Sequence, residues 1–138
     1  MDKNKFLLGI KEIDKSHSKL MKVIENLELC FAKEQPYPNE EISELLVDAE
    51  DFATSHFRQE EELMIVFGYP LFREHRNQHD LFFRKLEKLA EFKDNEQIPS
   101  KEVRNFSLFL NNWFKDHICN DDKRYAEWIQ ERVLNIVS

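Results

Sequence analysis

The residues best suited to chemistry in this chain are its five histidines, which all fall on the apolar stripes of predicted helices. Such a stripe repeats every three or four residues and faces a neighbouring helix. A buried imidazole needs partners for its ring nitrogens, and each unpaired one costs roughly 2 kcal/mol or more. A metal ion is the simplest partner for several imidazoles in one core. The four stripes are Ile10, Ile13, His17, Leu20, Ile24, Leu27 and Phe31; Ile42, Leu45, Ala49, Phe52 and His56; Phe72, His75, His79, Phe82, Leu86 and Leu89; and Val103, Phe106, Leu110, Trp113 and His117.

Two successive helices carry candidate ligands spaced four residues apart, His56 with Glu60 and His75 with His79. Residues at this spacing lie one turn apart on the same helix face, so that each pair can bind one metal ion or two adjacent ions. Either pair alone is weak evidence, because helices rich in glutamate produce such spacings by chance. With two further histidines on the remaining stripes, the set predicts a metal site inside a helical core.

Asp122 is the seventh candidate ligand, five residues after His117. On an ideal α-helix this spacing places the two side chains about 140° apart. Asp122 can reach the site only if the helix loosens or ends here. The short polar side chains of Asn120, Asp121 and Asp122 compete with helical backbone hydrogen bonds, so we expect a distorted helix at this point.

The elements that must position these residues are helices. The chain has 138 residues and a mass of 16.7 kDa, which fits one domain over residues 1–138. Only two glycines and four prolines are present, and no long stretch alternates apolar and polar residues, so the fold class is predicted to be all-α. Helix breakers near residues 36–39, 68–70 and 94–99 divide the chain into four segments with short connections. This pattern favours an up-down-up-down four-helix bundle.

Bundle topology brings the candidate ligands to one level. The first and third helices start at the end of the bundle where the second and fourth finish. Three of the ligands come early in their helices and three come late in theirs. We therefore expect all six to meet near one cross-section: His17, His75 and His79 with His56, Glu60 and His117.

Composition excludes several other classes of protein. The 20 basic and 27 acidic residues give a net charge of −7, which disfavours nucleic acid as a partner. The N-terminal residues contain no apolar run typical of a signal peptide, and no segment approaches the ~20 apolar residues of a membrane span, so a cytoplasmic location is expected. Cys30 and Cys119 are far apart and form no CxxC pair, which argues against a zinc knuckle and favours free thiols.

Four sequence motifs carry the candidate ligands: IDKSH ending at His17, HFRQEEELM from His56, YPLFREHRNQH ending at His79, and WFKDHICNDDKRY around His117. Together they resemble the hemerythrin family, in particular its single-domain bacterial members, over nearly the whole chain. The resemblance implies two iron ions joined by an oxo or hydroxo bridge, with reversible binding of dioxygen. One iron would be held by His75, His79 and His117, the other by His17 and His56, with Glu60 and Asp122 bridging them.

By the same resemblance, the iron with two histidines keeps a coordination position open for dioxygen. We expect a dry pocket around this position, lined by Leu20, Phe57, Trp113 and Ile118. The donor set also suits iron on chemical grounds, because imidazole and carboxylate ligands are present and soft thiolate ligands are not.

Two other function classes remain open. One is a di-iron enzyme that acts on peroxide or nitric oxide or repairs iron centres. Oxygen-activating carboxylate bundles typically use Glu-x-x-His pairs, and this sequence contains none, so reversible binding is favoured over catalysis. The other class is an oxygen or redox sensor that acts through a separate partner, for which Trp128, Ile129 and the C-terminal tail are the candidate surface.

Overall fold

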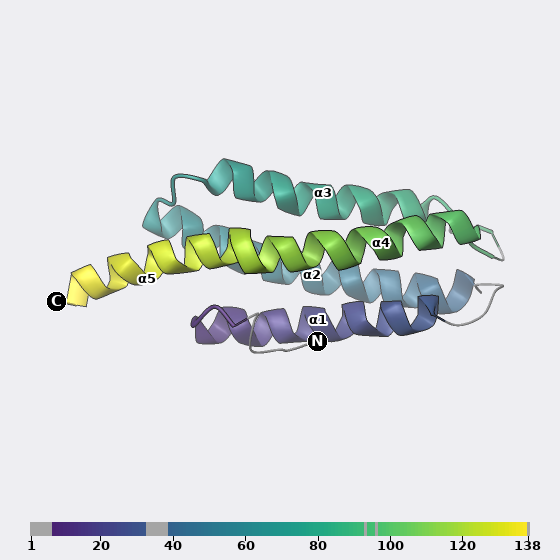
Figure 1. Ribbon diagram of the computed structural model, residues 1–138, viewed down its shortest axis with the longest axis horizontal. Helices are drawn as coiled ribbons and strands as arrows, with labels where there is room; N and C mark the ends of the chain where they lie inside the picture. The colour runs from purple at the N-terminus through teal and green to yellow at the C-terminus, as the bar shows by residue number, and fades with distance from the viewer. Residues whose placement is uncertain (1–6, 33–38, 93, 96, 138) are drawn as a thin grey trace.

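The computed structural model describes residues 7–32, 39–92, 94–95 and 97–137, and shows four helical rods lying side by side (Figure 1). Each rod packs against its neighbours around the bundle, and the predicted all-α, up-down-up-down bundle is confirmed. Among the described residues, no helix combines the length and the apolar character needed to cross a membrane. The elements are α1 (Lys11–Phe31), α2 (Asn39–Phe67), α3 (Phe72–Ala90), and a last rod formed by α4 (Ser100–Asp116), η2 (His117–Asp122) and α5 (Lys123–Val137).

The candidate ligands lie between two apolar clusters. The larger cluster contains Leu20, Phe57, Phe82 and Ile118, and the smaller one lies toward the other end of the bundle. Each rod contributes buried or partly buried residues to both clusters, α3 reaching the smaller one through Phe72, and the candidate ligands lie where the two contributions meet along the sequence. The polar layer is therefore closed by hydrocarbon on both sides. The smaller cluster consists of Leu8, Ile13, Met64, Tyr69, Tyr125, Ala126 and Ile129.

The predicted stripe of α2 is wrong at one position. Phe52 was expected to face the core, but its side chain is 39% exposed, whereas Ala53 is fully buried. The buried face of α2 runs through Ala49, Ala53 and Phe57 and is rotated slightly from the predicted stripe, and the ring of Phe57 makes edge contacts with Phe82 and Phe83 of α3. This rotation carries Phe52 out of the core, so it cannot help to keep the site dry.

The turn between α2 and α3 depends on Gly68. The Gly68 backbone has φ = +69°, a conformation that strains residues with a Cβ atom. Its N–H donates to the carbonyl of Ile65 at 3.2 Å, and the N–H of Tyr69 donates to the carbonyl of Met64 at 2.8 Å. This is the Schellman pattern, in which a left-handed residue closes the last turn of a helix. Because Tyr69 and Met64 also pack together in the smaller cluster, the turn fixes where α3, with its two histidines, begins.

Replacing Gly68 with alanine is expected to lower the free energy of unfolding by about 1 kcal/mol, because the left-handed backbone is retained at a cost. Nothing lies within 4 Å of the added methyl group, so no collision should contribute. Urea unfolding of the wild type and the variant measures this difference. Gly68→Asn should lose less, since asparagine tolerates this conformation better. Equal losses for both variants would show that backbone strain is not the cause.

The segment before α1 is attached to two helices. The carboxylate of Asp14 accepts hydrogen bonds from the backbone N–H of Leu8 at 2.8 Å and of Gly9 at 3.1 Å. The side-chain amide of Gln130 donates to the carbonyl of Leu8 at 3.0 Å. Leu8 is thereby buried in the smaller cluster, and the segment closes the core beside the histidine layer.

Candidate metal centre

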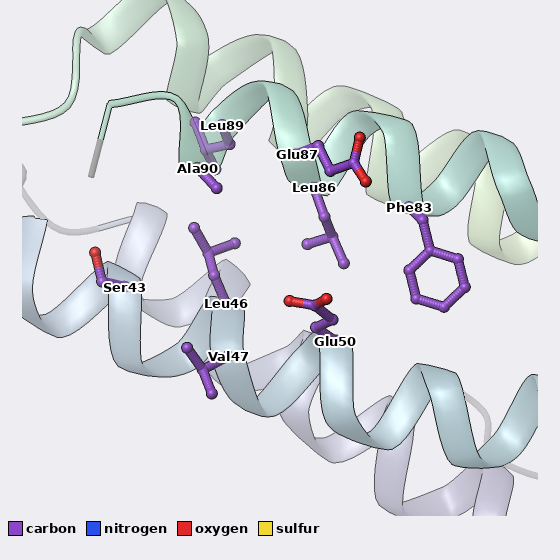
Figure 2. A pocket seen from close by; sticks show the side chains of 9 residues that line it. All are labelled: Ser43, Leu46, Val47, Glu50, Phe83, Leu86, Glu87, Leu89 and Ala90. Atoms are coloured by element: carbon purple, nitrogen blue, oxygen red, sulfur yellow. The ribbon is translucent and has the colours of Figure 1, made fainter. Parts of the chain in front are cut away.

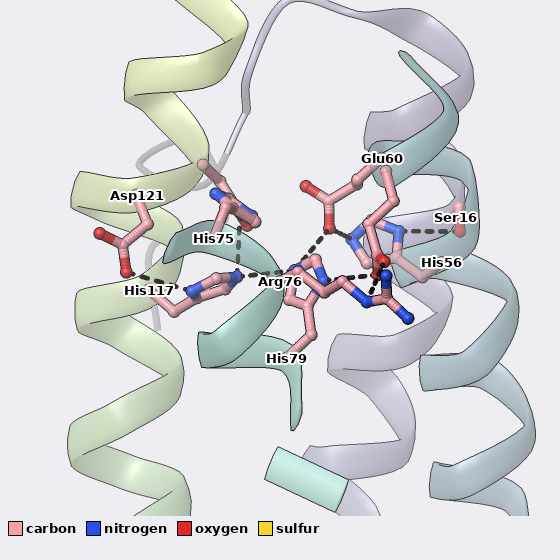
Figure 3. A network of polar contacts seen from close by, with 10 residues as sticks. Ser16, His56, Glu60, His75, Arg76, His79, His117 and Asp121 are labelled. Atoms are coloured by element: carbon pink, nitrogen blue, oxygen red, sulfur yellow. Dashed lines mark hydrogen bonds and ion pairs between the residues drawn. The ribbon is translucent and has the colours of Figure 1, made fainter. Parts of the chain in front are cut away.

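All seven candidate ligands are buried and belong to one polar layer inside the bundle. None of their side chains is more than 4% exposed. The histidines come from all four rods, and several point their Nε2 atoms toward a common centre (Figure 3). The structure therefore brings together all seven candidate ligands that the sequence analysis selected.

Four of these residues form one tight group. The Nε2 atoms of His75 and His117 lie 3.0 and 3.1 Å from Oδ1 of Asp122. Nε2 of His79 lies 3.1 Å from Nε2 of His117. One ligand atom from each of the four side chains lies within 4.8 Å of the others, which is a suitable size for a single metal ion.

The other three residues form a second group beside the first. The rings of His17 and His56 stack with their centroids 4.9 Å apart and their planes 9° from parallel. Nε2 of His56 lies 3.1 Å from Oε1 of Glu60, and the same oxygen lies 3.8 Å from Nε2 of His79. Glu60 thus lies between the two groups, as a bridging ligand would.

The unpaired atoms of the layer fit a metal better than a hydrogen-bond network. For example, Nε2 of His56 and Oε1 of Glu60 are 3.1 Å apart, but the two atoms do not form a hydrogen bond. Burying carboxylates and imidazoles in this way is costly unless a cation neutralises them. Imidazole and carboxylate donors together suit iron. The buried atoms without a hydrogen-bond partner include His17 Nε2, His56 Nε2, both Glu60 oxygens, His75 Nε2 and Asp122 Oδ1.

A break in helical geometry positions Asp122. Residues His117–Asp122 form a π-helix between α4 and α5, which confirms the predicted departure from a regular α-helix. The wider turns of a π-helix reduce the rotation per residue, and π-segments often mark functional sites. As a result, Asp121 and Asp122 contact different nitrogens of the same ring. Oδ2 of Asp121 lies 3.2 Å from His117 Nδ1, and Oδ1 of Asp122 lies 3.1 Å from His117 Nε2.

Three side chains outside the candidate ligands hold imidazole Nδ1 atoms, and the sequence analysis did not select them. Ser16 Oγ lies 2.9 Å from Nδ1 of His56, Glu61 Oε2 lies 3.0 Å from Nδ1 of His79, and Asp121 takes the same place for His117. If each Nδ1 carries the proton and donates it to these oxygens, Nε2 keeps its lone pair for a metal. Each of the three partners is next to a candidate ligand in the sequence. Polar and charged residues are common at such positions, so the sequence alone does not single these three out.

Tyr125 is a further residue that the sequence analysis missed. Its ring is fully buried and meets the His75 ring edge-on at a centroid distance of 5.2 Å. Among the described residues, its hydroxyl has no hydrogen-bond partner. Burial, followed by the charges of Glu60 and Asp122, raises the pKa of Tyr125 well above its usual value, so it remains a neutral phenol beside the carboxylates.

The pKa values of the neighbouring residues His79 and His117 are shifted in opposite directions. Burial lowers the pKa of His79 to about 3, so this imidazole is neutral. Burial also opposes a charge on His117, but the negative charge of Asp122, followed by the hydrogen bond that His117 donates to Asp121, raises its pKa to about 10. A proton on His117 thus balances part of the buried negative charge. A metal cation in the same place would balance this charge instead, and its binding would release the proton.

The four predicted pocket residues are buried to different degrees. Leu20 and Ile118 are fully buried. Phe57 stacks on His79 at 3.8 Å, and the half-buried Trp113 stacks on His117 at 4.7 Å. Both aromatic rings therefore cover ligands of the three-histidine group. Against His17 lies Phe114, with a centroid distance of 5.8 Å, a residue that the sequence analysis did not select.

A separate surface hollow lies between α2 and α3 (Figure 2). Its floor is apolar, and it includes two carboxylates, Glu50 and Glu87. None of the seven candidate ligands lines it, so it is distinct from the metal centre. Its lining residues are Ser43, Leu46, Val47, Glu50, Phe83, Leu86, Glu87, Leu89 and Ala90.

Comparison with known proteins agrees with this geometry. Residues 8–129 match the family model described as the hemerythrin HHE cation binding domain. A bacteriohemerythrin of Clostridium acetobutylicum is 30% identical over 127 residues, covering 91% of this chain and 97% of that protein. A bacteriohemerythrin of Stenotrophomonas maltophilia is 31% identical over 89% of this chain and 76% of its own length. One from Aquifex aeolicus is 27% identical over 83% of this chain and 86% of its own length.

No solved structure matches the chain significantly. The family model nevertheless covers most of the chain, including all seven candidate ligands, and the bundle holds those ligands at one level. The chain belongs to the hemerythrin family.

Proposed function

We propose that this protein binds two iron ions and, through them, binds dioxygen reversibly, for storage, delivery or scavenging. The observation that carries the proposal is the buried layer of imidazole and carboxylate atoms, six of which converge without a hydrogen-bond partner among the described residues. Two donor groups linked by Glu60 support a pair of ions rather than a single one. The names of the similar bacterial proteins support the same function.

In this proposal, each side chain has a defined role. His75, His79 and His117 hold one iron, His17 and His56 hold the other, and Glu60 and Asp122 bridge the two. The iron held by two histidines has one protein ligand fewer, which leaves a position for dioxygen. When bound, the iron pair supplies two electrons that dioxygen can take up and return. The seven ligands come from four rods of one bundle, so the fold sets their separation before any ligand arrives.

The surrounding side chains keep the layer dry. Leu20 and Ile118 are fully buried, and the rings of Phe57 and Trp113 cover His79 and His117. Excluding water withholds the protons with which oxygen could leave as hydrogen peroxide, a loss that turns reversible binding into irreversible oxidation of the iron. The buried phenol of Tyr125 is a polar group within this dry layer, and it keeps its proton beside Glu60.

The wild-type protein is expected to hold two iron ions per chain, and His79→Ala to hold about one or fewer, because the substitution removes a donor from the three-histidine group. Iron analysis after gel filtration gives the ratio. Asn77→Ala, on the exposed surface of the same helix, is the matched control and should retain two. A wild-type value of one zinc per chain would contradict the proposal.

Reversibility is tested by reducing the iron-loaded protein without air, admitting dioxygen, and then removing it. We expect an absorption change that appears with dioxygen and disappears under vacuum over repeated cycles. Consumption of dioxygen with irreversible oxidation of the iron would instead indicate a di-iron enzyme. Absence of any change with dioxygen, in protein that holds two ferrous ions, would contradict the proposed binding of dioxygen.

A further inference from the structure

The two candidate iron sites differ in the residues that hold their histidines. Both carboxylates found at imidazole Nδ1 atoms, Glu61 and Asp121, hold histidines of the three-histidine group. The described partner in the two-histidine group is the neutral hydroxyl of Ser16, at His56. The carboxylates that accept hydrogen bonds from imidazole Nδ1 atoms therefore lie on one side of the layer.

Glu61 connects the buried layer to the protein surface. Its Oε2 lies 3.0 Å from Nδ1 of His79, whose side chain is 1% exposed. Its Oε1 lies 3.7 Å from Nε of Arg76, whose side chain is 61% exposed. The Glu61 side chain itself is 22% exposed, between these two partners. One carboxylate thus shares its charge between a buried imidazole and a solvated guanidinium.

We infer that Glu61 is a positioning residue that makes His79 a stronger donor and so favours the oxidised state of the iron held by the three histidines. The inference rests on the proposed iron pair and explains why its two irons should differ in their preference for the oxidised state. Asp121 acts in the same direction on His117, but it is next to Asp122, so substitution there would also disturb a candidate ligand.

The physical reason lies in the charge of the imidazole. A carboxylate that accepts the Nδ1–H bond draws the proton toward itself and leaves more electron density on Nε2. A more basic donor stabilises a trivalent ion more than a divalent one. The hydrogen bond also fixes the ring orientation, for which a neutral acceptor would be sufficient. Charge and orientation can therefore be separated by substitution.

Substituting Arg76 should change the preference for the oxidised state in the direction opposite to substituting Glu61. Its positive charge attracts the carboxylate of Glu61 and reduces the negative charge felt by His79. Removing Arg76 should leave Glu61 more fully available to His79, and the oxidised state should be favoured further. The effect should be smaller than that of Glu61, because a pair this exposed is screened by solvent.

The experiment compares Glu61→Gln, Glu61→Ala, Arg76→Gln and, as the matched control, Glu62→Gln, which makes the same charge change at an exposed neighbour. Reduction potentials of the iron-loaded proteins are measured by optical titration, and affinities for ferrous iron by anaerobic competition with a chelator. Thermal unfolding of the iron-free forms reports any general loss of stability.

Glu61→Gln retains an acceptor and loses the charge, so it should retain iron while the preference for ferric over ferrous iron falls about tenfold, which raises the potential by about 59 mV. Glu61→Ala should also lower iron affinity by about 10- to 100-fold. Arg76→Gln should shift the potential in the opposite direction, and Glu62→Gln should leave it unchanged.

Equal potentials for wild type, Glu61→Gln and Glu62→Gln, in proteins that all hold two irons, would overturn the inference and leave the proposed function intact. A shift of the same size in Glu62→Gln would also overturn it, because surface charge in general would then be the cause. Failure of the wild type to hold an iron pair would instead refute the proposed function.

Discussion

Removing iron is expected to lower the free energy of unfolding by about 4 kcal/mol or more, the stabilisation given by a ligand present at about a thousand times its dissociation constant. Without the ions, Glu60 and Asp122 remain in a layer that is closed to water, beside five imidazoles. Protonation of His117 balances only part of that charge. For a chain of this size, we expect the melting temperature to fall by roughly 10 °C or more.

Calorimetry of the loaded protein and of protein stripped by a chelator measures this difference. Anaerobic addition of ferrous iron should restore the higher melting temperature. His79→Ala is the informative control, because it should gain much less from the same addition. Equal melting temperatures with and without iron would show that the layer is stable by itself, and the unpaired buried atoms would then require another explanation.

The apolar stripes were sufficient to predict the bundle and the level at which the histidines meet. His17 and His79 could be identified because an imidazole on an otherwise apolar stripe is unusual, and that contrast is visible in the sequence. The distortion after His117 was also predictable, because only a wider helix turn could bring Asp122 to the site, and the π-helix confirms it. These features depend on the spacing of residues within one helix, which the sequence contains directly.

The features that were missed depend on how one helix is rotated against another. Phe52 and Ala53 are consecutive, and the rotation of α2 against its neighbouring helices decides which of them is buried. Glu61 lies within a run of three glutamates, of which the sequence marks none as the partner of His79. Tyr125 is one turn beyond Asp122, where an aromatic residue is compatible with ordinary core packing. Each assignment requires contacts between segments far apart in the sequence.

Replacing Leu20 or Ile118 with glutamine is expected to speed oxidation of the iron pair in air about tenfold while both irons remain bound. Both side chains are fully buried next to the histidine layer, so a glutamine there brings an amide donor and room for water into a dry region. One additional hydrogen bond to the departing reduced oxygen contributes about 1.4 kcal/mol, which corresponds to a tenfold change in rate. It helps oxygen to leave as hydrogen peroxide, with the iron left oxidised.

The rate is measured from the loss of the oxygenated absorption spectrum, with iron content determined before and after. Leu20→Met and Ile118→Leu are the matched controls, since they change shape and keep the pocket apolar. They should oxidise at nearly the wild-type rate even if they destabilise the fold slightly. If a substitution only disturbed core packing, the variant would lose stability or iron. It would not oxidise faster while it retains both ions. Wild-type rates in both glutamine variants would place dioxygen away from Leu20 and Ile118, on the side of the layer where Phe57 and Trp113 cover His79 and His117.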